Sequence, residues 1–277
     1  MKTLVTHRSP DLDAIVSLWL IVRHLDGWED PVFAFVHAGK TLNEEAPDAD
    51  KNIIHVDTGL GRFDHHQLDE RTCAARIVLN FLKEHGHIRK RSLEPLERIV
   101  DVVDIYDNFG EVSFPEPMSD VYTFSLNEII GGLKALNQDD QKTVEMVFPM
   151  LDALLLAMKQ KVGAEHEVNR GITMTTKYGK SLFMETSNDE AMKVALKSGY
   201  TFVARKDPRG GYIRIKTFPS DAYDLTPLHA AIVAEDYTGT WFLHSSRCML
   251  LNGSWKNRES VASPLTLSRL IEITKEI

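Results

Sequence analysis

Residues 1–25 read MKTLVTHRSPDLDAIVSLWLIVRHL, and this stretch decides the fold that the sequence predicts. Its first part, from Lys2 to His7, is a short β-branched run, which is typical of a strand. Ser9-Pro10 then predicts an N-cap followed by a proline at the first helical position, and apolar residues from Ala14 to Leu25 continue a helix. A strand, a turn and a helix in this order predict the start of an α/β domain.

Further strands and helices are predicted up to residue 170. The runs 31–36 and 52–56 are apolar with little polar alternation, as expected of strands in a parallel sheet that is covered on both faces. Helices are predicted over three later ranges, 72–84, 93–106 and 127 to about 169. We therefore expect an N-terminal α/β domain with a parallel sheet over residues 1–170.

Beyond Arg170 the composition changes to short strands with Gly, Pro and Asp between them, which predicts a smaller α/β domain over residues 171–277. Its expected strands are 172–176, 181–185, 202–205, 212–217, 241–243 and 249–251, and its expected helices are 227–234 and 265–275. Because ligand sites tend to lie at domain interfaces, we expect the active site in the cleft between the two domains.

The composition of the 277 residues excludes several classes of protein. Hydrophobic residues make up 43% and charged residues 26%, which is typical of a globular protein. The 32 Lys and Arg residues against 40 Asp and Glu residues give a net charge of −8, which excludes the broad basic surface of a double-stranded DNA binder. The longest apolar run, Ala14 to Val22, is too short to span a membrane, and no signal-peptide core precedes it, so we expect a cytoplasmic protein.

Histidines and aspartates gather where the predicted strands end. They form four clusters in chain order: His7 with Asp11 and Asp13, Asp57, Asp64-His65-His66, and Asp101 with Asp104 and Asp107. Open α/β sheets bind ligands at this edge, and imidazole with carboxylate is a good ligand set for divalent transition metals. Each cluster also has an interpretation without a metal. In chain order these are helix capping for the first cluster, a turn for Asp57, a solvated loop for the third cluster and a solvated helix face for the fourth.

The ordered series resembles the DHH phosphoesterase superfamily, whose motifs run H-x-x-x-D-x-D, a strand-end D, D-H-H and a later D. All four are found within the first 110 residues. Asp64-His65-His66-Gln67 and the later stretch 104–108 are similar to the Myg-one-like exonuclease branch, while Arg209-Gly210-Gly211 partly resembles an element of the oligoribonuclease branch. The resemblance implies a two-domain phosphohydrolase.

The resemblance also implies a centre with two Mn²⁺ ions, for which Mg²⁺ or Co²⁺ can substitute. The implied ligands are His7, Asp11, Asp13, Asp57, His65 and Asp104, with Asp57 bridging both ions. Asp101 or Asp107 is the alternative to Asp104, after a shift of one helical turn. Asp64 and His66 are the implied catalytic residues: Asp64 orients a histidine, and His66 contacts the scissile phosphate or assists the leaving group.

Arginines and glycines near the strand ends of the second domain are candidates for holding a substrate phosphate, because arginine forks match phosphate geometry. The candidates are Arg205, Arg209, Gly210, Gly211, His244 and Arg247. The alternative interpretation of the Pro-Arg-Gly-Gly stretch at 208–211 is a hairpin turn.

The expected function is hydrolysis of a phosphoester or phosphoanhydride bond by a water activated between two metal ions. The expected substrate is a short single-stranded oligonucleotide or another small phosphorylated molecule. Two alternatives remain open from the sequence. One is a metal- or nucleotide-binding module without turnover, and the other is an enzyme similar to inorganic pyrophosphatases. The sequence makes no prediction of oligomeric state.

Overall fold

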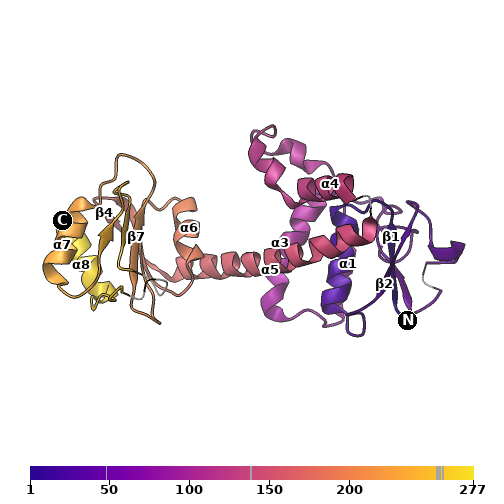
Figure 1. Cartoon of the computed structure of the whole chain (residues 1–277), viewed down its shortest axis with the longest axis horizontal. Coiled ribbons are helices and arrows are strands. Elements are labelled where there is room, and N and C mark those ends of the chain that lie inside the picture. Colours follow the sequence, from indigo (N-terminus) through magenta and orange to yellow (C-terminus); the bar gives the residue numbers. More distant parts are fainter. Residues whose placement is uncertain (48, 138, 254–256, 258) are drawn as a thin grey trace. The chain divides into compact units, whose positions relative to one another are not determined.

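The computed structural model describes residues 1–47, 49–137, 139–253, 257 and 259–277. It divides into two compact units, Met1–Lys159 (unit 1) and Gln160–Ile277 (unit 2). The long helix α5, Asp140–Arg170, contributes residues to both units (Figure 1). The boundary between the units therefore falls inside this helix, whereas the sequence analysis placed it at the end.

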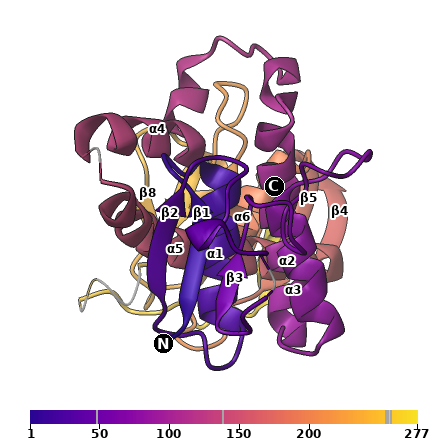
Figure 2. The ribbon, with the colours of Figure 1, turned by 90° about the vertical axis from the view of Figure 1, so that its right-hand side faces the viewer.

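Unit 1 contains a three-stranded parallel sheet. Strand β1 (Thr3–His7) lies in the middle, with β2 (Val32–Val36) on one side and β3 (Ile53–His55) on the other (Figure 2). The prediction of an α/β fold with parallel strands is confirmed for this unit. Because the strands are parallel, their carboxyl ends meet at one edge of the sheet.

The helices of unit 1 follow the predicted order with two differences. The N-cap of α1 is Asp11 rather than Ser9, because the Asp11 side chain accepts a hydrogen bond from the Ala14 amide. The helical region after residue 126 consists of two helices. The Asp139 side chain accepts a hydrogen bond from the Lys142 backbone amide and so caps the start of the second helix. The elements are α1 (Leu12–His24), α2 (Ala74–Glu84), α3 (Lys90–Asp107), α4 (Leu126–Asn137), α5, and the 3₁₀ turns η1 (Leu42–Glu44), η2 (Gly110–Ser113) and η3 (Asp120–Phe124).

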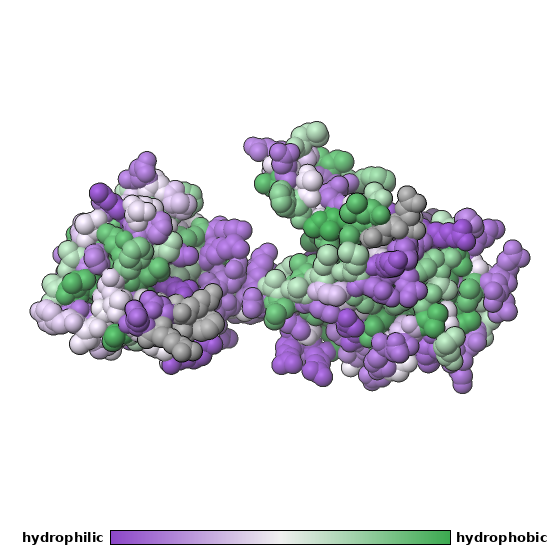
Figure 3. Space-filling model, viewed as in Figure 1, coloured by the Kyte–Doolittle hydropathy of each residue, from purple (hydrophilic) through white to green (hydrophobic). Residues whose placement is uncertain are grey.

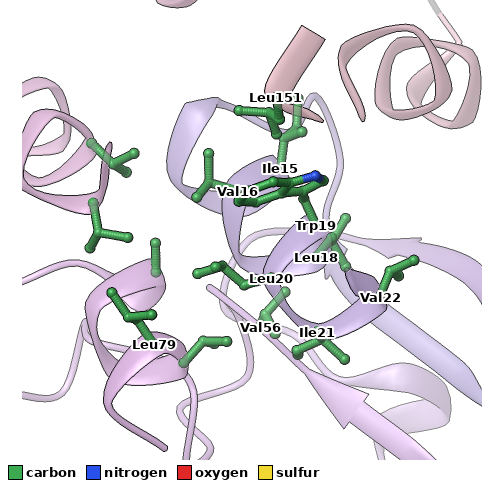
Figure 4. Close-up of a cluster of buried hydrophobic side chains, with 14 of the residues drawn as sticks. Ile15, Val16, Leu18, Trp19, Leu20, Ile21, Val22, Val56, Leu79 and Leu151 are labelled. Carbon is green, nitrogen blue, oxygen red and sulfur yellow. The ribbon is translucent and has the colours of Figure 1, made fainter. Parts of the chain in front are cut away.

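Helix α1 is the centre of the unit 1 core. Every residue from Leu12 to Val22 is buried, because α1 packs against β1 and against helices α2, α3 and α4. Trp19 and Leu18 lie in the same cluster as Leu79 of α2 and Leu151 of α5 (Figure 4). Each fully buried side chain of this size contributes about 1.5–3 kcal/mol. Burial on all faces explains why the α1 sequence is apolar almost throughout.

Unit 2 contains a six-stranded sheet in the order β4-β5-β6-β7-β9-β8. Strands β5 and β6 are parallel, and the other neighbouring pairs are antiparallel. Its elements are β4 (Ile172–Thr176), β5 (Gly179–Glu185), α6 (Glu190–Lys197), β6 (Phe202–Lys206), β7 (Ile213–Thr217), α7 (Thr226–Glu235), β8 (Phe242–Leu243), β9 (Met249–Leu251) and α8 (Leu267–Glu276). Helix α6 was not predicted from the sequence.

The two faces of this sheet carry separate cores, because successive side chains on a strand point to opposite faces. Phe183 and Phe202 belong to the cluster that includes residues of α7 and α8. Leu182 and Val203, their neighbours in sequence, belong to the cluster that includes α6 and the end of α5. In Figure 1, α6 lies on one side of β7, and α7 and α8 lie on the other. Within the described part of the chain, no helix has both the length and the apolar character needed to cross a membrane.

Asp236 organises the chain that follows α7. Its buried carboxylate accepts hydrogen bonds from the backbone amides of Thr238 and Gly239 and from the Trp241 indole. Burial opposes its charge, but these bonds and the contact with Ser263 outweigh that cost and lower the pKa of Asp236 to about 2. The charged carboxylate therefore stabilises the folded form of unit 2.

Asp236→Asn is expected to lower the free energy of unfolding of unit 2 by about 2 kcal/mol at pH 7. The pKa is lowered in the folded form, so this stabilisation is complete above about pH 4 and is lost as the pH falls toward 2. Hydrogen exchange of the β6 and β7 amides measures it, with the exposed Asp221→Asn as a control. A deficit of the same size at pH 2 and pH 7 would assign the effect to packing instead.

Candidate metal centre

The carboxyl ends of β1 and β3 place His7 beside Asp57. His7 is the last residue of β1, and Asp57 follows the neighbouring strand β3. His7 Nε2 lies 3.2 Å from Asp57 Oδ2. The Asp57 backbone has φ = 53°, in the left-handed region, and its amide donates to the Phe63 carbonyl. This strained turn folds the chain back, so that the segment after Phe63 returns to Asp57.

Asp11 joins this pair from the start of α1. Its Oδ1 accepts from the Ala14 amide as a helix cap, while its Oδ2 lies 3.8 Å from His7 Nε2. The capping interpretation of Asp11 and the metal-ligand interpretation are therefore compatible, because each uses a different carboxylate oxygen.

Asp13 lies deeper, in the first turn of α1, and is almost completely buried. Its two oxygens accept hydrogen bonds from the backbone amides of Ala74 and Ala75, at 2.7 and 2.8 Å. These alanines are the first two residues of α2. The first amides of a helix have no partner within the helix, so this carboxylate caps α2 from α1. Its Oδ2 also lies 3.8 Å from His65 Nε2.

His65 is surrounded by three carboxylates. Its Nε2 lies 3.3 Å from Asp57 Oδ1, 3.6 Å from Asp107 Oδ2 and 3.8 Å from Asp13 Oδ2. Among the described residues, both His65 Nε2 and Asp57 Oδ1 are buried without a hydrogen-bond partner. Unpartnered buried atoms of this kind are rare, and a metal ion between them would satisfy both.

The candidate ligands form three overlapping groups, each with its ligand atoms within 4.8 Å of one another: His7 with Asp11 and Asp57, Asp13 with His65 and Asp107, and Asp57 with His65 and His66. Five of the six predicted ligands are therefore brought together. The donor set of imidazole nitrogens and carboxylate oxygens fits divalent metals such as Mn²⁺. The identity of the ion stays a prediction.

Asp104 is the predicted ligand that does not join these groups. Its Oδ1 accepts from the Asn108 side chain. Asp101, the other alternative, pairs with Arg76. Asp107, the last residue of α3, takes the expected place, because its Oδ2 lies 3.6 Å from His65 Nε2.

Asp64 and His66 form a pair at the edge of the centre. The buried Asp64 carboxylate accepts from the Leu60 amide and from His66 Nδ1, the latter at 2.7 Å. A carboxylate at neutral pH only accepts, so His66 Nδ1 carries the proton and Nε2 is the remaining nitrogen. The predicted role of Asp64, to orient a histidine, is compatible with this hydrogen bond and stays a prediction.

His66 lines a hollow of about 330 Å³ in unit 1. The sequence analysis did not identify Ala38 and Gly39, which follow β2 and also line it. Their position directly after a parallel strand is the signal that indicates such residues. The complete lining is His7, Asp11, Ala38, Gly39, Asp57, Leu60, Asp64, His66 and Asp107.

The ionisable groups of the candidate centre shift one another's pKa values. Burial disfavours a charged His7, but its hydrogen bonds to Asp57 and to the Arg8 carbonyl raise its pKa to about 9. The adjacent Asp57 carboxylate raises the pKa of His65 to about 9 as well, against its desolvation. Desolvation raises the pKa of Asp13 well above its usual value and that of Asp107 to about 6. Burial opposes ionisation of Asp57, yet the two imidazoles hold its pKa below the usual range.

We expect Mn²⁺ affinity to rise with pH between 7 and 9. Both histidines are protonated at pH 7, and each must lose a proton before Nε2 can bind an ion, so affinity gains roughly tenfold per pH unit for each proton released. Calorimetric titration in two buffers of different protonation enthalpy counts these protons, and at pH 7 about one is expected from each histidine, in addition to any from Asp13. Binding without proton release would show that neither histidine is a ligand.

The Asp104 and Asp107 assignments can be separated with a matched pair of variants. Asp107→Asn should weaken Mn²⁺ binding by at least roughly tenfold, because outer ligands and their supports typically contribute this much or more. Asp104→Asn removes the same charge one helical turn earlier and should leave affinity nearly unchanged. Titration of free Mn²⁺ by electron paramagnetic resonance measures both. Equal losses would return Asp104 to the ligand set.

In unit 2 the predicted phosphate-binding arginines are paired with carboxylates of the same unit. Arg205 is 3% exposed and contacts Asp189 and Asp207. Arg209 pairs with Asp207, and Arg247 pairs with Asp224.

Gly210 and Gly211 lie in the connection between β6 and β7, where the Gly211 amide donates to the Asp207 carbonyl. His244 Nδ1 lies 2.9 Å from Ser246 Oγ. The geometry therefore favours the turn interpretation of 208–211, and the substrate roles of all these residues stay predictions.

Comparison with protein families decides one point. The model of the family described as "ChrB, C-terminal domain" matches residues 4–158, more than half of the chain. The chain belongs to this family. The match covers nearly all of unit 1 and every residue of the metal centre. The matching family is not a DHH family, so the DHH resemblance depends on the motifs and on the geometry of the centre.

No curated protein matches the chain. Two solved structures show distant similarity. An uncharacterized protein from Helicobacter pylori G27 has 13% identity and a TM-score of 0.29, with 100% of this chain and 98% of that chain covered. RecJ in complex with Mg²⁺ from Thermus thermophilus has 11% identity and a TM-score of 0.34, with 99% of this chain and 49% of RecJ covered. Because both TM-scores are low, we base the function on the residues of this chain.

Proposed function

We propose that this chain is a metal-dependent phosphohydrolase that acts on a short single-stranded oligonucleotide or a small nucleotide. The observation that carries the proposal is that Asp57 Oδ1 and His65 Nε2, 3.3 Å apart, are buried without a hydrogen bond among the described residues and lie in the overlapping ligand groups. Carboxylates packed this closely repel one another, and a bound cation would offset that repulsion. These residues follow one another along the chain in the order of the DHH motifs. This order supports phosphoester or phosphoanhydride hydrolysis as the proposed reaction.

Asp57 is suited to bridge two ions, because its two oxygens face different groups. Oδ2 lies beside His7, which is grouped with Asp11, and Oδ1 lies beside His65, which is grouped with Asp13 and Asp107. His7 Nδ1 is next to the Arg8 carbonyl, which can only accept, so the neutral ring presents its Nε2 lone pair to the centre. Two bound divalent ions would stabilise the attacking and leaving oxygens of a phosphoryl group.

His66 is the proposed proton donor to the leaving group. Asp64 holds its ring through Nδ1, and the side chain is 59% exposed at the edge of the hollow. The hydrogen bond to Asp64 fixes the ring orientation and leaves Nε2 to give a proton to the leaving group. His66 Nδ1 also lies 3.8 Å from Asp57 Oδ1, so the donor is placed beside the proposed reaction centre.

The substrate class follows from charge and size. The net charge of −8 argues against a long duplex, and the hollow of about 330 Å³ has room for a phosphate and part of a nucleotide. The proposed substrate is therefore a small or single-stranded phosphoester. The proposed location of the protein is the cytoplasm. Inorganic pyrophosphate is the second candidate, since it needs only the centre itself.

His66→Gln should lower kcat by roughly 100-fold or more while Mn²⁺ binding is retained, because a general acid contributes about 10²–10⁴. Asp57→Asn should abolish both activity and two-ion binding. The assay uses Mn²⁺ with three substrates: bis-p-nitrophenyl phosphate, pyrophosphate and RNA of roughly 2–5 nucleotides. RNA of about this length is long enough to fill the hollow. The exposed His85→Gln is the matched control.

The outcomes separate the candidates. Preference for the diester and the RNA supports the proposal, and preference for pyrophosphate supports the second candidate. Mn²⁺ binding without turnover of any substrate in the panel would replace the enzyme with a binding module.

A further inference from the structure

A second cavity in unit 1 lies outside the metal centre. It has a volume of about 300 Å³ and is formed by the end of α3, the turns η2 and η3, and the start of α4. Three aromatic residues and three carboxylates contribute to its wall. The complete lining is Tyr106, Glu111, Phe114, Pro117, Met118, Ser119, Asp120, Tyr122, Thr123 and Glu128.

The three aromatic rings form a connected wall. Tyr106 and Phe114 are perpendicular with ring centroids 6.0 Å apart, and Phe114 and Tyr122 are tilted with centroids 5.3 Å apart. The Tyr122 hydroxyl donates to the Pro115 carbonyl, which fixes this ring. Faces of aromatic rings attract cations, and walls of this kind recognise alkylated ammonium groups.

The charge of the cavity has one sign. Glu111, Asp120 and Glu128 contribute carboxylates, and no Lys, Arg or His is among the described residues that line it. Glu111 Oε2 is closed off from solvent and, within the described part of the chain, has no hydrogen-bond partner. The Glu111 carboxylate has no opposite charge among the described residues that line the cavity, and a cation held in the cavity would supply one.

The spacing of the carboxylates distinguishes an organic cation from a bare metal ion. In the described ranges, all groups of three or more possible metal ligands within 4.8 Å belong to the centre around Asp57 and His65. The three carboxylates of this cavity do not form such a group. Their spacing is therefore wider than a bare metal ion requires and suits a larger organic cation.

We propose that this cavity binds a small organic ammonium ion, with its alkyl groups against Tyr106, Phe114 and Tyr122 and its charge near Glu111. The surface around the cavity is also apolar, with Met118 93%, Phe124 84% and Val121 68% exposed. Figure 3 shows hydrophobic residues, in green, on the surface of this part of unit 1. This site is independent of the proposed phosphohydrolase activity and is not required by it.

The test is a titration of the full chain with choline, followed by nuclear magnetic resonance of the amides from 106 to 128. Saturable binding with a single site is expected, and 3,3-dimethylbutan-1-ol, a neutral molecule of the same shape, should bind at least roughly tenfold more weakly. Equal binding of the two molecules, or no response to choline at tens of millimolar, would overturn the proposal.

Variants assign the binding to the cavity. Glu111→Gln and Tyr122→Leu should each weaken choline binding by roughly tenfold, whereas Tyr122→Phe, which keeps the ring, should retain it. Glu116→Gln removes a charge from the same segment without touching the cavity, and it should have little effect. If Tyr122→Leu does not fold, Glu111→Gln against Glu116→Gln decides alone, and equal effects of these two would refute a specific site.

Discussion

The buried carboxylate of Asp13 is the interaction on which unit 1 depends most. The carboxylate of Asp13, in the first turn of α1, accepts hydrogen bonds from the first two backbone amides of α2. It therefore fixes the start of α2 to the first turn of α1. Burial raises the pKa of this carboxylate, and the hydrogen bonds from the α2 amides offset part of the cost of its charged form. His65 lies against the same carboxylate, so the joint between the helices is also one wall of the metal centre. Structure and proposed chemistry are therefore not separable at this residue.

The metal centre combines several features that do not favour stability. Asp57 has a left-handed backbone, it shares one ligand group with the acid Asp11, and its Oδ1 has no hydrogen bond among the described residues. The apolar burial of α1 and the regular parallel sheet offset this strain. Concentrated strain and charge on a well-packed support is the pattern expected of a functional site rather than of a solvated surface.

Much of the fold and the centre was predictable because local rules determine it. Apolar runs located the three parallel strands, and parallel pairing then required the residues after them, such as His7 and Asp57, to lie at one edge. The break between α4 and α5 was missed because helical periodicity continues across it, while a single cap at Asp139 causes it. The choice between Asp104 and Asp107 depends on where α3 ends relative to His65, which is a tertiary property that spacing alone does not contain. The pairing of Arg205 with Asp189 and Asp207 likewise involves contacts that no motif encodes.

The division of Asp57 between two neighbours has a consequence for how the centre fills. One oxygen faces the His7 group and the other faces the His65 group, so a charge placed on either side polarises a carboxylate that both share. If each half binds an ion, as proposed, the two occupancies are thermodynamically linked, so the first ion changes the affinity for the second by the same factor as the second changes the affinity for the first. The centre would behave as one cooperative unit with macroscopic binding constants, and neither half would have an affinity of its own.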